Sequence, residues 1–504
     1  MAEKRSLADR LPYTIPLAEN VRLRRVRAAV YVLLIAAFVA VTIQFQVLTV
    51  RNYRGLGEQA HKGAVGRWRT AVDEFWEGRN IYRNPVDGPG EAAPGRPLPP
   101  RQNYLHPNMP FTVMLLTPFA LLPVPWMAIT WSLLKVGLVV MALLMAARLA
   151  AHHRRRTSDW VVLLGLLWAL DFLIGDIQHG NTNVLVLGAI CLHLWLYRRG
   201  NDFWAAAPLV AAICLKMTPA LFLLYWLYQR NWKLLGGAVV FLFLFVVVVP
   251  WAALAVAFGP GHYFHLTAAW LDNLILPGLV KGAWYPVHIN QSISGVFSRY
   301  FLEGQYGDIF WNADDDPGYL PQEKPGWITL VALSPVTVKW MIRGVQLLVV
   351  AAMAWAIGWR KLPRDDGRRA LHYGLVLTGM MLLNQRTWNH HAAVLLPAYV
   401  AAWHALGYGR MNRLPRLTAF ALLMLAGPLL WMSGNAMVKV VAALSGHAMR
   451  KGAHWADYVK AYGPTFYHFL LLLMVLVILS AALRRKDKPY LDARQPLLAD
   501  SETE

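Results

Sequence analysis

The chain has 504 residues, of which 57% are hydrophobic and only 15% charged, and its formal net charge is +21. This composition excludes a soluble globular domain and indicates a polytopic membrane protein. The positive charge does not indicate nucleic acid binding, because most of it lies in short clusters between apolar runs, as in cytoplasmic loops. The two cysteines, Cys191 and Cys214, fall within apolar runs, so we expect neither a disulfide framework nor a metal site.

The chain begins with a basic tail over residues 1–28, and the first apolar run is Ala29–Val50. The tail is too long and too charged for an ordinary signal peptide, and no small-residue cleavage site follows the apolar run. We therefore expect the tail to be cytoplasmic. Residues 485–504 form a second polar tail, which we also expect to be cytoplasmic and disordered.

Residues 51–125 form a long first loop, expected on the outer side, with a Pro- and Gly-rich patch at Val86–Pro100. Within it, Gly66–Gly78 has the periodicity of an amphipathic helix with several aromatic residues on one face. Such a helix suits the outer surface of the membrane. The apolar run Met109–Leu122 is short and rich in proline, which predicts an interfacial or re-entrant helix instead of a full span.

The remaining chain predicts an all-α, polytopic transmembrane helix bundle over residues 29–484, with a second long outer loop at residues 259–335. Every second connection is basic, and this alternation predicts about twelve spans with both termini inside. The predicted spans are Ala29–Val50, Trp126–Ala150, Trp160–Ile174, Val184–Tyr197, Phe203–Leu215, Pro219–Tyr228, Leu234–Phe258, Val336–Trp359, Leu371–Leu383, His391–Leu406, Leu414–Met432 and Phe466–Leu483.

The stretch Gly175–Asn183 joins two of these spans and is strongly polar. Polar groups at a membrane boundary face a protein interior or a water-filled cavity, and they are candidate functional residues. The candidates here are Asp176, His179, Asn181 and Asn183. Taken alone, the stretch could equally be a polar turn between two helices.

Two further polar stretches should lie on the same side of the membrane. Lys216 stands just before Pro219, which breaks the helix, and could either snorkel to the boundary or bind an anion such as a phosphate. Asn384–His391 contains Arg386, which can hold a phosphate in a bidentate fork, and Trp388, which can stack on a sugar ring. His390 and His391 are adjacent, so on a helix they point about 100° apart, which disfavours a shared metal ion.

The outer loops supply weaker candidates. The amides of Asn290 and Gln291 suit sugar hydroxyls, although the run Tyr285–Ser292 could instead be a capped junction before a helix. The run Asp314–Asp316 lacks the ligand spacing of a metal site and is expected to be solvated. In the first loop, one of several acids could be a catalytic base, with Asp73 the leading candidate and most of the others solvated.

Several short motifs, in this order along the chain, resemble polyprenyl-phosphate-dependent glycosyltransferases of the GT-C fold, specifically glycosyltransferase family 87. The resemblance runs from about Gly66 to about Pro397. Each motif is weak alone, but their order and their common side are specific. The motifs are the run from Gly78 to Tyr82, Asn103–Pro110 with Leu121–Pro123, Gly180–Asn183, Lys216–Pro219, Asn290–Ser292 and Trp388–His391.

The resemblance implies transfer of a hexose, mannose in some relatives, from a polyprenyl-phosphate carrier to an outer-face glycolipid or glycan, in a bacterial plasma membrane and without a cofactor or metal. Membrane lipids are the other expected partners. Family members carry an acid early in the first loop, but Lys62–Trp68 contains none here. Asp176 is the predicted replacement as catalytic base, with Asp73 second.

In this reading Lys216, Arg386 and His390 bind the donor phosphate. The sugars are oriented by His179, Asn181, Asn183, Asn290, Gln291 and Trp388. The alternative is a transporter or flippase of lipid-linked sugars, which would also need many spans and buried polar groups. The sequence shows no paired halves, and its polar clusters gather at one face, so the enzyme is favoured.

Overall fold

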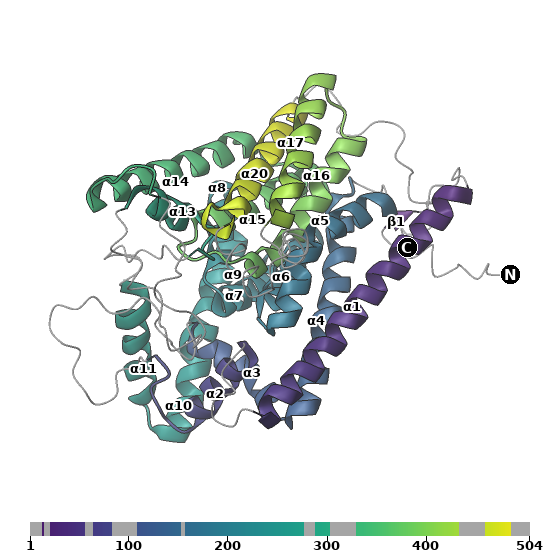
Figure 1. Ribbon diagram of the computed structural model, residues 1–504. Coiled ribbons are helices and arrows are strands. Elements are labelled where there is room, and N and C mark those ends of the chain that lie inside the picture. Colours follow the sequence, from purple (N-terminus) through teal and green to yellow (C-terminus); the bar gives the residue numbers. More distant parts are fainter. Residues whose placement is uncertain are drawn as a thin grey trace.

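The computed structural model describes residues 13–14, 21–55, 64–82, 108–152, 157–276, 288–302, 329–432 and 459–484 (Figure 1). These residues are helical or lie in short connections, apart from one two-residue pairing of β1 (Tyr13–Thr14) with β2 (Thr157–Ser158). The predicted all-α class is therefore confirmed. The patch Val86–Pro100, the runs Tyr285–Val287 and Asp314–Asp316, and the tail from residue 485 lie outside the described residues.

Every predicted span coincides with one helix or with two or three consecutive helices. Among the described residues, seven helical segments are long and apolar enough to cross a membrane alone, the longest being 27 residues. The count of about twelve spans stays a prediction, because the other segments are shorter. The elements are α1 (Val21–Gly55), α4 (Val124–Ala150), α5 (Asp159–His179), α6 (Asn183–Arg198), α7 (Asp202–Leu215), η3 (Thr218–Ala220), α8 (Leu221–Tyr228), α9 (Trp232–Leu242), η4 (Phe243–Val248), α10 (Val249–Phe258), α14 (Pro335–Ile357), α15 (Arg368–Leu383), η9 (Asn389–Leu395), α16 (Leu396–Tyr408), α17 (Arg413–Met432) and α20 (Pro464–Leu483).

The two long loops also contain helices. The first loop carries α2 (Ala64–Trp76) and α3 (Pro110–Ala120), and the second carries α11 (His262–Trp270), η5 (Leu271–Ile275) and α13 (Ile293–Phe301). The predicted amphipathic helix of the first loop is thus confirmed as α2. At 11 residues, α3 is about 17 Å long and too short to cross a bilayer, as expected for a re-entrant or interfacial helix.

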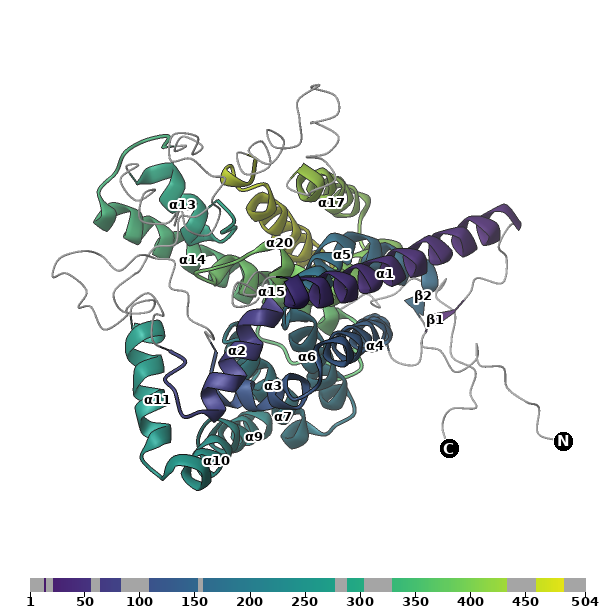
Figure 2. The same ribbon diagram turned by 60° about the horizontal axis from the view of Figure 1, so that its bottom comes forward.

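Helix α2 buries its apolar face against protein. The ring of Trp68 lies 5.2 Å from that of Trp131 on α4, and the indole N–H of Trp76 donates to the hydroxyl of Thr117 on α3, at 2.8 Å. Figure 2 shows α2 beside the end of α1 and close to α3. The apolar face of α2, which the sequence predicted to lie at the membrane surface, is therefore covered largely by α3 and α4.

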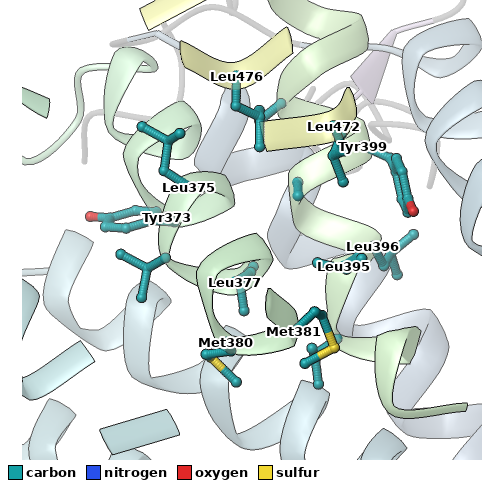
Figure 3. Packing of buried hydrophobic residues seen from close by; sticks show 14 of the residues in the cluster. Tyr373, Leu375, Leu377, Met380, Met381, Leu395, Leu396, Tyr399, Leu472 and Leu476 are labelled. Carbon is teal, nitrogen blue, oxygen red and sulfur yellow. The ribbon is translucent and has the colours of Figure 1, made fainter. Parts of the chain in front are cut away.

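The core centres on α15, in which 14 of 16 residues are buried. Its side chains pack against those of α16 and α20, and Figure 3 shows Leu377, Leu396 and Leu472 among this group. Helix α17 lies along α20 on the other side, and the two helices run together in both views of the ribbon (Figures 1 and 2). A helix that is apolar on all sides is stabilised by protein contact in every direction, so α15 fixes its neighbours relative to one another.

The basic connections gather at one end of the bundle, which we call the basic end. Arg364 forms two hydrogen bonds to Asp202, one of them 2.8 Å long, and Arg27 lies 3.2 Å from Asp159. His152 lies 3.5 Å from Asp366. The pairing of β1 with β2 brings the N-terminal tail to this end as well. The alternation read from the sequence therefore corresponds to a real separation of two ends of the fold.

Candidate active site

The polar stretches predicted to share one side of the membrane meet at the end of the bundle opposite the basic end. Helix α5 ends in this region, and Gly180 reverses the chain into α6 with a left-handed φ of +65°. A Cβ atom at Gly180 would stand only 2.2 Å from Cγ2 of Val65 and 3.0 Å from the ring of Phe45. The start of α2 is therefore packed directly onto the turn between α5 and α6, and only glycine fits there.

Asp176, in the last turn of α5, is fully buried and bonded at both carboxylate oxygens. The Lys135 ammonium, also fully buried, lies 2.8 Å from Asp176 Oδ2 and donates to the Asp176 carbonyl at 2.5 Å. The side-chain amide of Asn183 donates to Asp176 Oδ1 at 2.8 Å, and the backbone N–H of Val184 donates to Oδ2 at 3.3 Å. The carboxylate thus caps the start of α6 and neutralises a lysine inside the bundle.

Lys216 follows the last residue of α7 and is half-buried. Its ammonium donates to Oδ1 of Asn183 at 2.7 Å, so that Asn183 bridges Lys216 and Asp176. The chain then turns through η3, which begins with Thr218 and Pro219. The bend that Pro219 predicted is present, and it places Lys216 beside the polar stretch instead of in lipid.

The stretch Asn384–His391 completes the cluster. The ring of His390 lies 5.5 Å from that of His179 and nearly parallel to it, and Trp388 stacks on His391 at 5.8 Å. Besides His179, the basic groups within electrostatic range of His390 are Lys216, Lys135 and Arg67. We call the group Arg67, Lys135, His179, Lys216 and His390 the basic cluster. Asp176 contacts Lys135 of this cluster directly and Lys216 through the amide of Asn183.

Two members of the basic cluster did not stand out in the sequence. Lys135 is a single lysine in the middle of the apolar run Trp126–Ala150, and an ionisable residue in a span is itself a signal of function. Arg67 stands in the run Lys62–Trp68, where the family resemblance implies an acid and the sequence has none. The structure shows that this region contributes a cation to the site.

Helix ends add to the positive potential. Helix α2 begins beside Gly180, α6 begins at Asn183, and Thr112 in the first turn of α3 donates to the carbonyl of Cys214, two residues before Lys216. The start of a helix carries a partial positive charge and unpaired N–H groups. The first N–H groups of α6 are already bonded to Asp176, so it is the starts of α2 and α3 that add to the attraction of the basic side chains for an anion.

Asn290 and Gln291 are brought near this region but are fully buried. The Asn290 amide donates to the carbonyl of Gln385 and accepts from the N–H of Thr387, at 2.8 and 3.0 Å. The Gln291 amide donates to the carbonyls of His288 and Lys460. The Asn290 side chain and the backbone N–H of Gln291, which donates to the carbonyl of Thr387 at 2.7 Å, therefore hold the loop of Arg386 and Trp388 in place. The Gln291 side chain ties its own segment to Lys460 instead, and a sugar contact from either residue stays a prediction.

The two candidate bases lie in very different surroundings. Asp176 has no exposed surface, and each of its carboxylate oxygens already has two polar partners. These contacts favour an anchoring role for Asp176. Asp73 is exposed on α2, where partial burial raises its pKa while Arg69 acts to lower it. It lies six residues after Arg67, so it points about 120° away from the direction of that residue. Neither assignment is tested by these distances, and both stay predictions.

The arrangement places several basic side chains next to apolar helices. Within the described ranges, no group of three or more His, Cys, Asp or Glu side chains is arranged to hold a metal ion. Cys191 and Cys214 are both buried as free thiols. The side chains here that could meet an anion are the lysines, the histidines and Arg67.

Comparison with known proteins identifies the family. The profile of glycosyltransferase family 87 matches residues 104–384. The chain is also similar to the polyprenol-phosphate-mannose-dependent alpha-(1-2)-phosphatidylinositol mannoside mannosyltransferase of Mycobacterium tuberculosis, with 24% identity over 379 residues. The aligned region covers 70% of this chain and 76% of that protein. No solved structure matches the chain. Because the family match covers more than half of a chain with this helical architecture, the protein belongs to glycosyltransferase family 87.

Proposed function

We propose that this glycosyltransferase moves a hexose, by analogy with its relative mannose, from a polyprenyl-phosphate carrier to a lipid or glycan acceptor on the outer face of a bacterial plasma membrane. One observation carries the proposal. The basic cluster lies where helix ends meet beside long apolar helices, so a monophosphate and its hydrocarbon tail would both find complementary surroundings. A purely polar sugar substrate would not need this combination.

The phosphate would lie between Lys216, His390 and Arg67. When the bond between the sugar and the phosphate breaks, negative charge grows on the departing phosphate oxygen. Fixed cations and helix starts stabilise that charge best in a site from which water is excluded. Arg386 remains a further candidate for this contact, since its loop is held against the site by Asn290.

The sugar would lie against the exposed part of the cluster. His179 is exposed, and its Nδ1 is fixed by the carbonyl of Gly175 at 2.7 Å, which leaves the Nε2 side for a hydroxyl. Asn181 and Trp388 are half-buried, and the Trp388 ring contacts His390, which in turn stacks on His179. The indole face of Trp388 suits a pyranose ring. Asn183 already bridges Asp176 and Lys216, so we assign it to the phosphate side of the site.

The acceptor hydroxyl must lose a proton as its oxygen attacks the anomeric carbon. A base within hydrogen-bond reach accelerates such a step by about 10²–10⁴-fold. If Asp176 is the base, Asp176→Asn should lose turnover by this factor while the donor still binds. If the acid is on α2, Asp73→Asn should do so instead, which requires α2 to turn toward the acceptor.

We infer the outer location of the basic cluster from the distribution of basic residues among the connections. Basic connections are retained in the cytoplasm, so the basic end should face inside and the basic cluster outside. This orientation separates the site from cytosolic nucleotide sugars and agrees with a lipid-linked donor.

The proposal is tested with purified protein in nanodiscs, supplied with radiolabelled polyprenyl-phosphate mannose and extracted membrane lipids. Transfer of label to a second lipid or glycan, lost in Lys216→Ala and retained in the exposed basic-end variant Lys361→Ala, would support it. Movement of intact donor across a proteoliposome membrane without any transfer product would instead support the flippase.

A further inference from the structure

The buried Lys135 belongs to the basic cluster, but the proposed function gives it no contact with the substrate. It lies within an apolar helix and is completely enclosed, together with its partner Asp176. Taking two charges out of water is costly, and a buried ion pair is weak evidence for stability alone. Stability alone therefore does not explain the Lys135–Asp176 pair, and the groups that the pair keeps in position must be considered.

The bonds continue from the pair toward the substrate site. Asp176 Oδ1 accepts from the Asn183 amide nitrogen at 2.8 Å, and the Asn183 oxygen accepts from Lys216 at 2.7 Å. The amide can face only one way. If it were reversed, its oxygen would meet a carboxylate oxygen and its NH₂ group would meet an ammonium, so both contacts would become repulsive. The charge of Asp176 therefore fixes Asn183, and Asn183 fixes Lys216.

Charge balance explains why two lysines are needed. Asp176 acts electrostatically on both Lys135 and Lys216. With Lys216 as its sole cation, the carboxylate would pair with it and cancel the charge that attracts a phosphate. Lys135 makes the direct contact at 2.8 Å, whereas Lys216 is separated from Asp176 by the neutral amide of Asn183. The charge of Lys216 is thus left for the substrate.

We propose that Lys135, Asp176 and Asn183 are positioning residues that hold Lys216 ready for the carrier phosphate and keep its charge unpaired. This inference rests on the proposed function, because it takes the ligand of Lys216 to be the phosphate of a polyprenyl carrier. None of the three needs to touch the sugar or take up a proton. Asp176 thereby has a role different from that of a catalytic base.

The experiment measures equilibrium binding of radiolabelled, sugar-free polyprenyl monophosphate to the full-length protein in detergent, together with donor KM and kcat. The variants are Asn183→Ala, Lys135→Met and Asp176→Asn, with Lys361→Ala as control, since Lys361 is exposed and bonded to a backbone carbonyl. We expect the three site variants to bind the carrier about tenfold more weakly. Their kcat at saturating donor should fall by much less than the roughly 10²–10⁴-fold expected for the loss of a base, because Lys216 itself is still present to meet the growing charge.

Lys135→Met leaves a buried carboxylate without its cation and can fail to fold. The double variant Lys135→Met with Asp176→Asn removes both charges, so it should recover thermal stability. It should still bind the carrier weakly, since an amide at position 176 no longer fixes the orientation of Asn183. Recovery of folding without recovery of binding is a result that a merely structural pair would not give.

Two results would overturn the inference. One is carrier affinity equal to wild type in folded Asn183→Ala and in the double variant, while Lys216→Ala loses binding. The other is Asp176→Asn with unchanged carrier affinity and a large loss of kcat, which identifies a base. If the wild-type protein does not bind polyprenyl phosphate at all, the proposed function itself fails, and that outcome is distinct from both.

Discussion

Replacing Gly180 by alanine should detach α2 from the site. Two costs arise at this position. The left-handed backbone, with φ of +65°, costs a residue with a Cβ roughly 1–2 kcal/mol. The new methyl would stand 2.2 Å from Val65 Cγ2 and 3.0 Å from the Phe45 ring, and such overpacking typically costs about 1–3 kcal/mol. The sum is about 2–5 kcal/mol, applied where the first turn of α2 packs.

The two costs are separable with a second substitution. Val65→Ala removes the Cγ2 atom that makes the closest contact, so Gly180→Ala combined with Val65→Ala should recover the packing part of the loss and retain the backbone part. Gly175→Ala is the matched control in the same stretch. Its added methyl would meet only Cβ of His390, at 3.9 Å, which is an ordinary contact.

The readout is hydrogen exchange of residues 64–76 in the purified protein, together with donor KM. Gly180→Ala should expose the amides of α2 and raise donor KM, since Arg67 would leave His390, and the addition of Val65→Ala should partly restore both. Equal protection of α2 in Gly180→Ala and Gly175→Ala would refute the packing of α2 on the turn. Lost protection with unchanged KM would show that Arg67 does not contact the donor.

Three further predictions use other parts of the fold. A cysteine placed at Asn181 should react with an impermeant maleimide added outside cells, with low background because both native cysteines are buried; reaction only from the cytoplasmic side would reverse the orientation. Lys216→Ala should raise donor KM about tenfold to a hundredfold, the loss expected for one charged hydrogen bond of 1.5–3 kcal/mol, and Arg386→Ala should follow it only if that side chain reaches the phosphate. Burial alone would raise the pKa of Asp366, but hydrogen bonds from His152 and Arg368 outweigh the effect of burial and hold that pKa well below the unfolded value of 3.8. The Asp366 carboxylate therefore stabilises the fold at neutral pH. This stabilisation is lost as the pH falls through the folded pKa. The difference in Tm between wild type and Asp366→Asn should therefore be largest at neutral pH and shrink in acid; a difference independent of pH would contradict the ion pairing.

The helices could be predicted from sequence because each depends on local features, namely a run of apolar residues that ends at Pro or Gly. The span predicted at Trp126–Ala150 is α4, and the amphipathic run Gly66–Gly78 is α2 with a shift of two residues at each end. The number of spans is less well determined. A helix as short as α8 would need neighbouring segments in order to cross a bilayer, and that dependence is not written in its own sequence.

The site was predictable as a set of stretches but not as a set of contacts. Periodicity and the basic loops placed Asp176, Lys216 and His390 on one side. They could not show that Asp176 is bonded at both oxygens, because one partner, Lys135, comes from another helix 41 residues earlier. The same is true of Asn290, whose amide looked suited to a sugar but binds the backbone of a loop about 95 residues later.

The two ends of the bundle show why the larger number of positive charges does not mark the anion site. At the basic end, cations meet acids directly: Arg27 with Asp159, and Arg364 with Asp202. Coulombic attraction to a substrate is largely cancelled where each charge already has a neighbour of opposite sign. In the basic cluster the carboxylate of Asp176 faces two lysines, and Lys216 meets it only through an amide. Under the proposed function, the charge of Lys216 is therefore the one best placed to attract a phosphate, and a phosphate with an apolar tail would gain more at the basic cluster than at the basic end.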